Sequence, residues 1–165
     1  MIDLHRILVP TDFSKFSDNA LRYAVAFAEK FEAELYLLHV VQNLTVIIPD
    51  ILPVEPPITP SVEELTTAVQ TAFDRIIAEN NLAKLKIHRD VREGTPFYEI
   101  IQAAKEGDID LIVMGTHGRE GMARLLIGSV AEAVVRRALC PVLTVHGAAP
   151  ELAADAIRVE ARSPA

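Results

Sequence analysis

The sequence predicts an α/β protein, a single doubly wound domain in which a five-stranded parallel sheet has helices on both faces. Short apolar segments alternate along the chain with longer segments that repeat apolar residues at helical spacing. Loops containing Gly, Pro, Ser or Asp separate the two kinds of segment. Strands that alternate with helices form parallel sheets. The 165 residues suit one domain, and 50% of them are hydrophobic, which is sufficient to build its core.

Each expected strand is a short apolar run, and the third differs from the others. Residues 84–91 alternate apolar with polar side chains, which is typical of an edge strand with one exposed face. The remaining runs are almost continuously apolar, as buried parallel strands are. The expected strands are residues 6–9, 34–41, 84–91 and 111–114, followed by Val142–Val145.

The expected helices begin at residues suited to helix starts. Ser14 or Ser17 caps the first helix. Ser61 opens the second helix with a capping box, and Asn80-Asn81 ends that helix. Thr95 caps the third, with Pro96 in its first position. The fourth runs from residue 129 to residue 139.

Composition excludes several classes of protein. The net charge of −7 and the pI of about 5.2 argue against a nucleic-acid binder, which normally presents a basic face. No apolar run approaches the roughly 20 residues needed to span a membrane. The N-terminus lacks the features of a signal peptide. We therefore expect a cytoplasmic protein that binds neither nucleic acid nor membrane.

A glycine-bearing loop joins the fourth strand to the fourth helix. Gly115, Gly118 and Gly128 are followed by Ser129, in the spacing G-x2-G-x9-G-S. A helix start offers unpaired N–H groups to an anion, and glycine lets a phosphate approach the backbone. Ser129 could cap the helix or bind the anion. The glycines could instead serve only tight turns, and neither P-loop nor dinucleotide-binding motif is present.

A second loop, Pro-Thr-Asp-Phe-Ser at residues 10–14, follows the first strand. The carboxyl ends of parallel strands are where open α/β sheets bind ligands. Asp12 in this loop has two interpretations. It could make a local turn bond, or its carboxylate could bind a ribose hydroxyl, a base amine or a metal ion.

The glycine loop, its helix and the closing Ala-Leu-Cys-Pro-Val-Leu-Thr-Val segment resemble the ATP-binding branch of the universal stress protein family. The resemblance covers about residues 2–146 and implies the strand order 3-2-1-4-5. We thus expect a nucleotide-binding domain at 1–146, with a proline-rich apolar insertion at 43–60 and a C-terminal tail at 147–165. In that order the two loops lie beside each other, at the point where open α/β sheets change winding direction.

The resemblance also implies roles for individual residues. The implied cofactor-binding residues are Pro10, Thr11, Asp12, Val40, Met114, Gly115, Gly118, Arg119, Gly128, Ser129 and Val130. The adenosine would lie against the first four and the phosphates against the last five, with Met114 and Gly115 beside the ribose. The implied ligand is ATP, or ADP or AMP, with Mg²⁺ or Mn²⁺ bridging the phosphates. Arg119 could equally be a solvated surface residue.

These features predict an ATP-binding regulatory or protective module of the stress response. No residue stands out as catalytic, and no metal-binding cluster is evident in the sequence. One alternative is a slow ATPase or adenylyl-transferring enzyme on the same fold. Another is a dimeric interaction protein that binds no nucleotide. The family also implies a homodimer through the last strand, Val142–Val145, and an unidentified protein partner remains possible.

Overall fold

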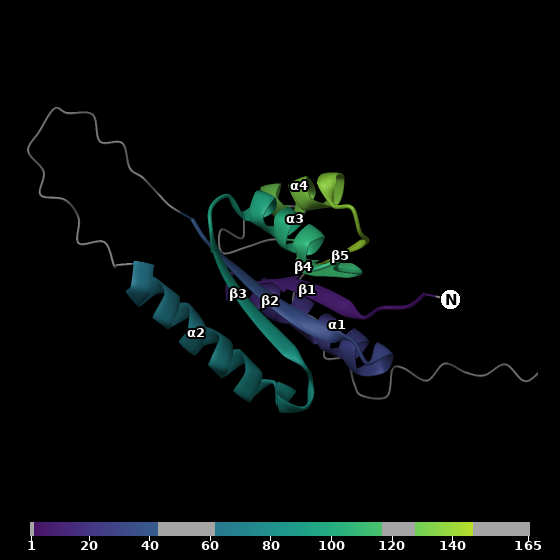
Figure 1. The fold of residues 1–165 in the computed structure, drawn as a ribbon, viewed down its shortest axis with the longest axis horizontal. Helices are drawn as coiled ribbons and strands as arrows, with labels where there is room; N and C mark the ends of the chain where they lie inside the picture. The colour runs from purple at the N-terminus through teal and green to yellow at the C-terminus, as the bar shows by residue number, and fades with distance from the viewer. Residues whose placement is uncertain (1, 43–61, 117–127, 147–165) are drawn as a thin grey trace, which may run out of the picture.

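The computed structural model describes residues 2–42, 62–116 and 128–146, which form one sheet with helices on both faces (Figure 1). The expected insertion and tail lie outside these residues. In chain order the elements are β1 (Arg6–Pro10), α1 (Lys15–Phe31), β2 (Glu34–Val41), α2 (Val62–Glu79), the 3-10 turn η1 (Leu82–Lys84), β3 (Ile87–Glu93), α3 (Pro96–Glu106), β4 (Leu111–Gly115), α4 (Ser129–Arg137) and β5 (Val142–Val145).

The five strands are parallel and lie in the order β3-β2-β1-β4-β5. β1 is the central strand, and β3 and β5 are the two edges. In the register, Leu8 of β1 lies beside Tyr36 of β2 on one side and Ile112 of β4 on the other. The predicted fold class and the strand order that the resemblance implies are both confirmed.

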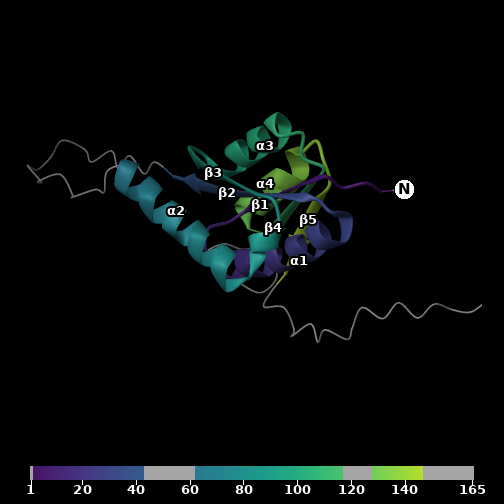
Figure 2. The ribbon, with the colours of Figure 1, turned by 60° about the horizontal axis from the view of Figure 1, so that its bottom comes forward.

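Alternate side chains of β1 enter two different cores. Ile7 and Val9 are fully buried in the core formed with α1 and α2, whereas Leu8 packs in the core formed with α3 and α4. Figures 1 and 2 show α1 and α2 together on one face of the sheet, with α3 and α4 on the opposite face. The helix after β1 and the helix after β4 therefore leave the sheet on opposite sides.

Local sequence signals explain the helix ends. The Ser14 side chain caps α1 by accepting a hydrogen bond from the Ser17 N–H at 3.4 Å. Thr95 occupies the N-cap of α3, Pro96 follows it, and Gly107 ends the helix by donating to the Ala103 carbonyl at 2.9 Å. The caps expected at Ser14 and Thr95 are found, although Thr95 makes no side-chain cap bond.

The third strand begins later than the sequence pattern indicates. Residues Leu82–Lys84 form the turn η1, and the Leu82 side chain is buried in the core shared with α2. This burial draws the chain toward α2, so that β3 starts at Ile87 and continues to Glu93. Among the described residues, no helix combines the length and apolar character that crossing a membrane requires.

Candidate functional site

The carboxyl ends of β1 and β4 lie side by side, because these two strands pair in the sheet. The loop after β1 turns toward the face covered by α1, and β4 leads through residues 117–127 to α4 on the other face. Neighbouring strands whose connections part in this way mark the switch point of a doubly wound sheet. The two loops singled out from the sequence therefore begin at one place.

The loop after β1 is held by hydrogen bonds within it. The Thr11 hydroxyl accepts from the Phe13 N–H and donates to the Ser17 hydroxyl, both at 3.0 Å. Ser17 in turn donates to the Ser14 carbonyl at 2.8 Å. The Thr11 N–H donates to the carbonyl of Leu38 in β2 at 2.8 Å. Thr11 thus fixes the loop both to the start of α1 and to the neighbouring strand.

The Asp12 carboxylate makes the local turn bond that was one of its two interpretations. Its Oδ1 accepts from the Ser14 N–H at 3.1 Å. This bond orients the side chain at the edge of the sheet, where it is half-buried. An oriented carboxylate is compatible with a ligand role, which stays a prediction.

Phe13 adopts an unusual backbone conformation in the same loop. Its φ is +62°, in the left-handed region that bulky residues rarely occupy. The ring is held between two others: its centroid lies 4.7 Å from that of His39 and 5.6 Å from that of Phe73. Such conformations persist where surrounding contacts determine them, and they concentrate at functional sites.

The last two residues of β4, Met114 and Gly115, differ in how deeply they are buried. Met114 is buried in the core between the sheet and α3 and α4. Gly115 pairs with Val145 of β5 and is half-buried. A ribose role for Met114 would therefore use its backbone. Gly118 and Arg119 lie outside the described residues.

The start of α4 differs in one detail from the sequence-based expectation. Gly128 is the N-cap, so Ser129 is the first helical residue and does not cap the helix. The Gly128 N–H donates to the Thr116 carbonyl at 2.7 Å, and this group is therefore already engaged. The first bond within the helix runs from the Glu132 N–H to the Gly128 carbonyl. The N–H groups of residues 129–131 consequently have no partner inside α4 and are the anion donors of this helix start.

A cavity of about 610 Å³ opens beside these N–H groups. It lies where the first turns of α3 and α4 approach each other, on the face of the sheet opposite α1. It combines polar groups from the loops with the apolar surfaces of an aromatic ring and aliphatic side chains. Its lining residues are Gln42, Gly94, Thr95, Pro96, Phe97, Ser129, Val130 and Ala133.

The cavity contains part of the expected site. Ser129 and Val130 line it, and Val40 packs against the core to which Phe97 and Val130 also belong. Pro10, Thr11 and Asp12 do not line it, since their loop turns toward the α1 face.

Gln42 and residues 94–97 line the cavity but were not among the site residues expected from the sequence. Gln42 follows β2, and Gly94 and Thr95 follow β3, so they too lie at the carboxyl edge. Their position directly after a parallel strand is the sequence signal that marks them as candidate ligand-binding residues.

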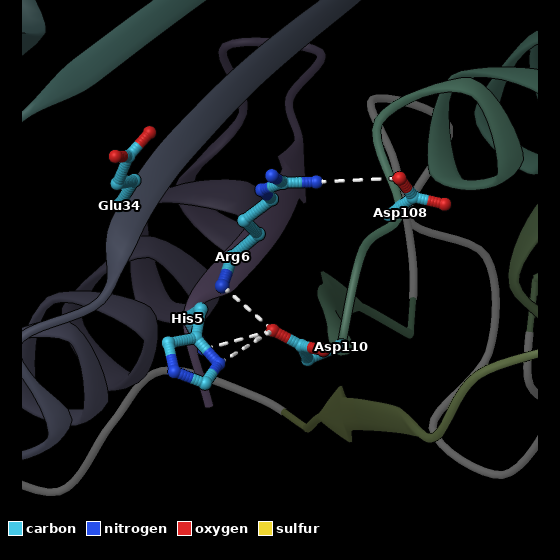
Figure 3. A pocket seen from close by; sticks show the side chains of 5 residues that line it. All are labelled: His5, Arg6, Glu34, Asp108 and Asp110. Carbon is cyan, nitrogen blue, oxygen red and sulfur yellow. Dashed lines mark hydrogen bonds and ion pairs between the residues drawn. The ribbon is translucent and has the colours of Figure 1, made fainter. Parts of the chain in front are cut away.

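A second cavity, of about 410 Å³, lies at the other end of the strands, where β1, β2 and β4 begin (Figure 3). Asp110 Oδ2 accepts from the backbone N–H groups of His5 and Arg6 at 2.8 and 2.9 Å. Arg6 Nη1 donates to the Gly107 carbonyl at 2.9 Å and lies 3.5 Å from Asp108. These groups bind one another and fasten the start of β1, so we assign this cavity a structural role. Within the described ranges, no cluster of three or more His, Cys, Asp or Glu side chains could hold a metal ion.

The chain is similar to known proteins over most of its length. The sequence model of the Universal stress protein family matches residues 4–146. Universal stress protein MJ0531 of Methanocaldococcus jannaschii is 39% identical over 141 residues, which are 85% of this chain and 81% of that protein. Universal stress protein MJ0577 of the same organism is 32% identical over 151 residues, covering 85% of this chain and 93% of that protein.

Solved structures agree with these sequence relationships. The structure of MJ0577 superposes with a TM-score of 0.72 at 29% identity, covering 90% of this chain and all of that one. A universal stress protein in complex with cAMP superposes with a TM-score of 0.62 at 26% identity, covering 88% of this chain and 98% of that one. The chain therefore belongs to the universal stress protein family.

Proposed function

We propose that this chain binds an adenine nucleotide, ATP with Mg²⁺ or Mn²⁺, at the carboxyl edge of its sheet. The bound nucleotide controls a regulatory or protective activity of the cytoplasmic stress response. The observation that carries this proposal is the cavity between the starts of α3 and α4, with the donors of residues 129–131 beside it. A family member with cAMP bound supports a nucleotide as the ligand.

The start of α4 suits the phosphates. Three successive N–H groups lack partners inside the helix, and the helix dipole places about half a positive charge at this end. The net charge of the protein is −7, so this local positive potential is what offsets the general repulsion of a polyphosphate. A Mg²⁺ or Mn²⁺ ion would neutralise phosphate charge and would need few protein ligands, and the Asp12 carboxylate at the carboxyl end of β1 could supply one of them.

The cavity suits the nucleoside. Its volume of about 610 Å³ lies within the usual range for small-molecule sites, roughly 300–1,000 Å³. Phe97, Val130 and Ala133 offer apolar surface to a flat base, and Gln42 and Thr95 offer hydrogen bonds to its edge. The cavity part of the proposed site therefore comprises Ser129 and Val130, which the family resemblance implies, together with Gln42, Thr95 and Phe97.

The first test is to identify what the protein carries. The protein is purified without added nucleotide and denatured, and the released small molecules are measured by mass spectrometry. We expect ATP or ADP near one per chain, or binding of added ATP with Mg²⁺ by calorimetry. An empty protein that also fails to bind added ATP would overturn the proposal.

The second test separates binding from folding. Ser129→Glu places a carboxylate at the first position of α4, where negative charge stabilises a helix by about 0.3–1 kcal/mol. The same carboxylate repels a phosphate at about 4 Å by roughly 1–4 kcal/mol. We expect an unchanged or higher Tm together with at least about tenfold weaker ATP binding. Ala26→Glu, on the exposed surface of α1, is the matched control and should bind ATP normally.

A further inference from the structure

Thr116 connects three elements at the base of the glycine loop. Its side chain is buried, with 3% of the residue exposed, directly after β4. Its N–H donates to the Val145 carbonyl of β5 at 3.0 Å, and its carbonyl accepts from the Gly128 N–H at 2.7 Å. The second bond joins the end of β4 to the residue that precedes α4.

The Thr116 hydroxyl fixes this junction to the end of β5. Its Oγ1 lies 2.6 Å from His146 Nδ1 and 3.4 Å from the Val145 carbonyl oxygen. The hydroxyl can donate to Nδ1, or it can accept from an Nδ1–H and donate to the carbonyl. In both arrangements the hydroxyl is hydrogen-bonded to Val145 or His146, at the end of β5, and these bonds favour one side-chain rotamer.

We infer that Thr116 is a positioning residue for the nucleotide phosphates. Its carbonyl holds the N-cap Gly128, and Gly128 begins the helix turn whose free N–H groups are those of residues 129–131. Its hydroxyl holds the carbonyl in place through His146. This inference rests on the proposed function and adds a residue that touches no phosphate but sets where the phosphate donors lie.

The choice of substitution isolates the hydroxyl. Thr116→Val keeps the branched shape of the side chain and replaces the hydroxyl with a methyl group, which makes no hydrogen bond. Thr116→Ser restores that group. Thr144→Val makes the same change on β5 at a half-buried threonine for which the structure shows no hydrogen bond, and it is the matched control.

The binding experiment compares ATP with adenosine by calorimetry. One lost hydrogen bond corresponds to about a three- to tenfold change in an equilibrium constant. We expect Thr116→Val to weaken ATP binding by about that factor and to change adenosine binding much less, because the N–H groups of residues 129–131 bind the phosphates and adenosine has none. Thr116→Ser and Thr144→Val should bind ATP as the wild type does. A general loss of structure would instead weaken both ligands together.

Hydrogen–deuterium exchange of the nucleotide-free protein gives an independent readout. We expect Thr116→Val to accelerate exchange at the Gly128 and Glu132 amides and to leave α3 unchanged. Unchanged exchange, or faster exchange with unaltered ATP affinity, would overturn the inference. If the wild type binds no ATP, the proposed function has failed. The role of Thr116 in holding phosphate donors then fails with it, whereas exchange still reports whether Thr116 anchors α4.

Discussion

His39 Nδ1 lies 2.7 Å from the carbonyl oxygen of Thr11, so a side chain of β2 holds the loop that follows β1. A carbonyl oxygen only accepts, and Nδ1 must therefore carry the proton. The same imidazole lies against the ring of Phe13, the residue with φ of +62°. One histidine thus supports both the hydrogen bonding and the strained backbone of the loop that contains Asp12.

The first prediction concerns this support. His39→Leu leaves the half-buried Thr11 carbonyl without its donor and should lower the free energy of unfolding by about 1–3 kcal/mol. It should also weaken ATP binding, because the Asp12 loop loses its fixed position. Urea unfolding and calorimetry measure the two effects. His39→Asn can place an amide donor near the same position and should recover part of the stability and part of the ATP affinity. A His39→Leu variant as stable as the wild type would show that this hydrogen bond does not stabilise the loop.

A second prediction tests the core beneath this loop. Phe73 of α2 is fully buried and its ring meets that of Phe13. Phe73→Ala should lower the free energy of unfolding by about 3–5 kcal/mol, because it loses buried apolar surface and leaves a cavity. Tyr98→Ala, at a residue that is 52% exposed on α3, should change it by only about 0.5 kcal/mol. Denaturant titrations that gave equal losses would argue against the placement of α2.

A third prediction concerns the stability of the fold at acid pH. The Lys86 ammonium and then the His88 ring, both bonded to Glu34, lower the pKa of its carboxyl from the usual 4.5 to about 2. The folded state therefore favours the charged carboxylate, and this contribution to stability is complete above pH 4.5 and is lost as the pH falls toward 2.

Glu34→Gln should therefore lower the Tm at neutral pH, with a gap to the wild type that narrows between pH 4.5 and pH 2. Thermal unfolding followed across this range by circular dichroism measures the gap. Glu29→Gln, on the exposed surface of α1, serves as the control, and its Tm should stay close to that of the wild type across the same pH range. A constant gap for Glu34→Gln would show that its ion pairs do not stabilise the fold.

The fourth prediction tests the dimer that the family resemblance implies. The N–H groups of Ile112 and Thr116 donate to the carbonyls of Pro141 and Val145, so these two residues of the last segment face β4. The backbone groups of successive residues in a strand point to opposite sides, and those of Thr144 therefore face the open edge of β5. Thr144→Pro removes the N–H group that faces this open edge. Proline is accepted at such positions of an edge strand, so the fold of the single chain should persist.

Light scattering at micromolar concentration should show a dimer for the wild type and for Thr144→Val, and a monomer for Thr144→Pro. A monomeric wild type would exclude pairing through this strand at that concentration. A proline variant that remained dimeric would place the interface elsewhere.

The helices and strands could be read from the sequence because their signals are local. Apolar periodicity indicated every strand and α-helix, and Ser14, Thr95 and Pro96 marked helix starts as found. The start of β3 was misplaced because the turn at Leu82–Lys84 depends on burial against α2, which the strand pattern does not encode. The strand order came from the family resemblance, since local patterns do not specify which parallel strands pair.

The sequence by itself determined the fold class, the family resemblance and the chemistry available at the carboxyl edge, because residue type and spacing fix these. Only the tertiary structure decided which backbone and side-chain groups already have hydrogen-bond partners, and which residues line the cavity together. The bonds of His39 to Thr11 and of Thr116 to His146 join residues 28 and 30 positions apart. The engaged Gly128 N–H and the cavity lined by Gln42, Thr95 and Phe97 depend likewise on how separate elements pack. Hydrogen-bond partners and cavities are properties of that packing, and no local pattern contains them.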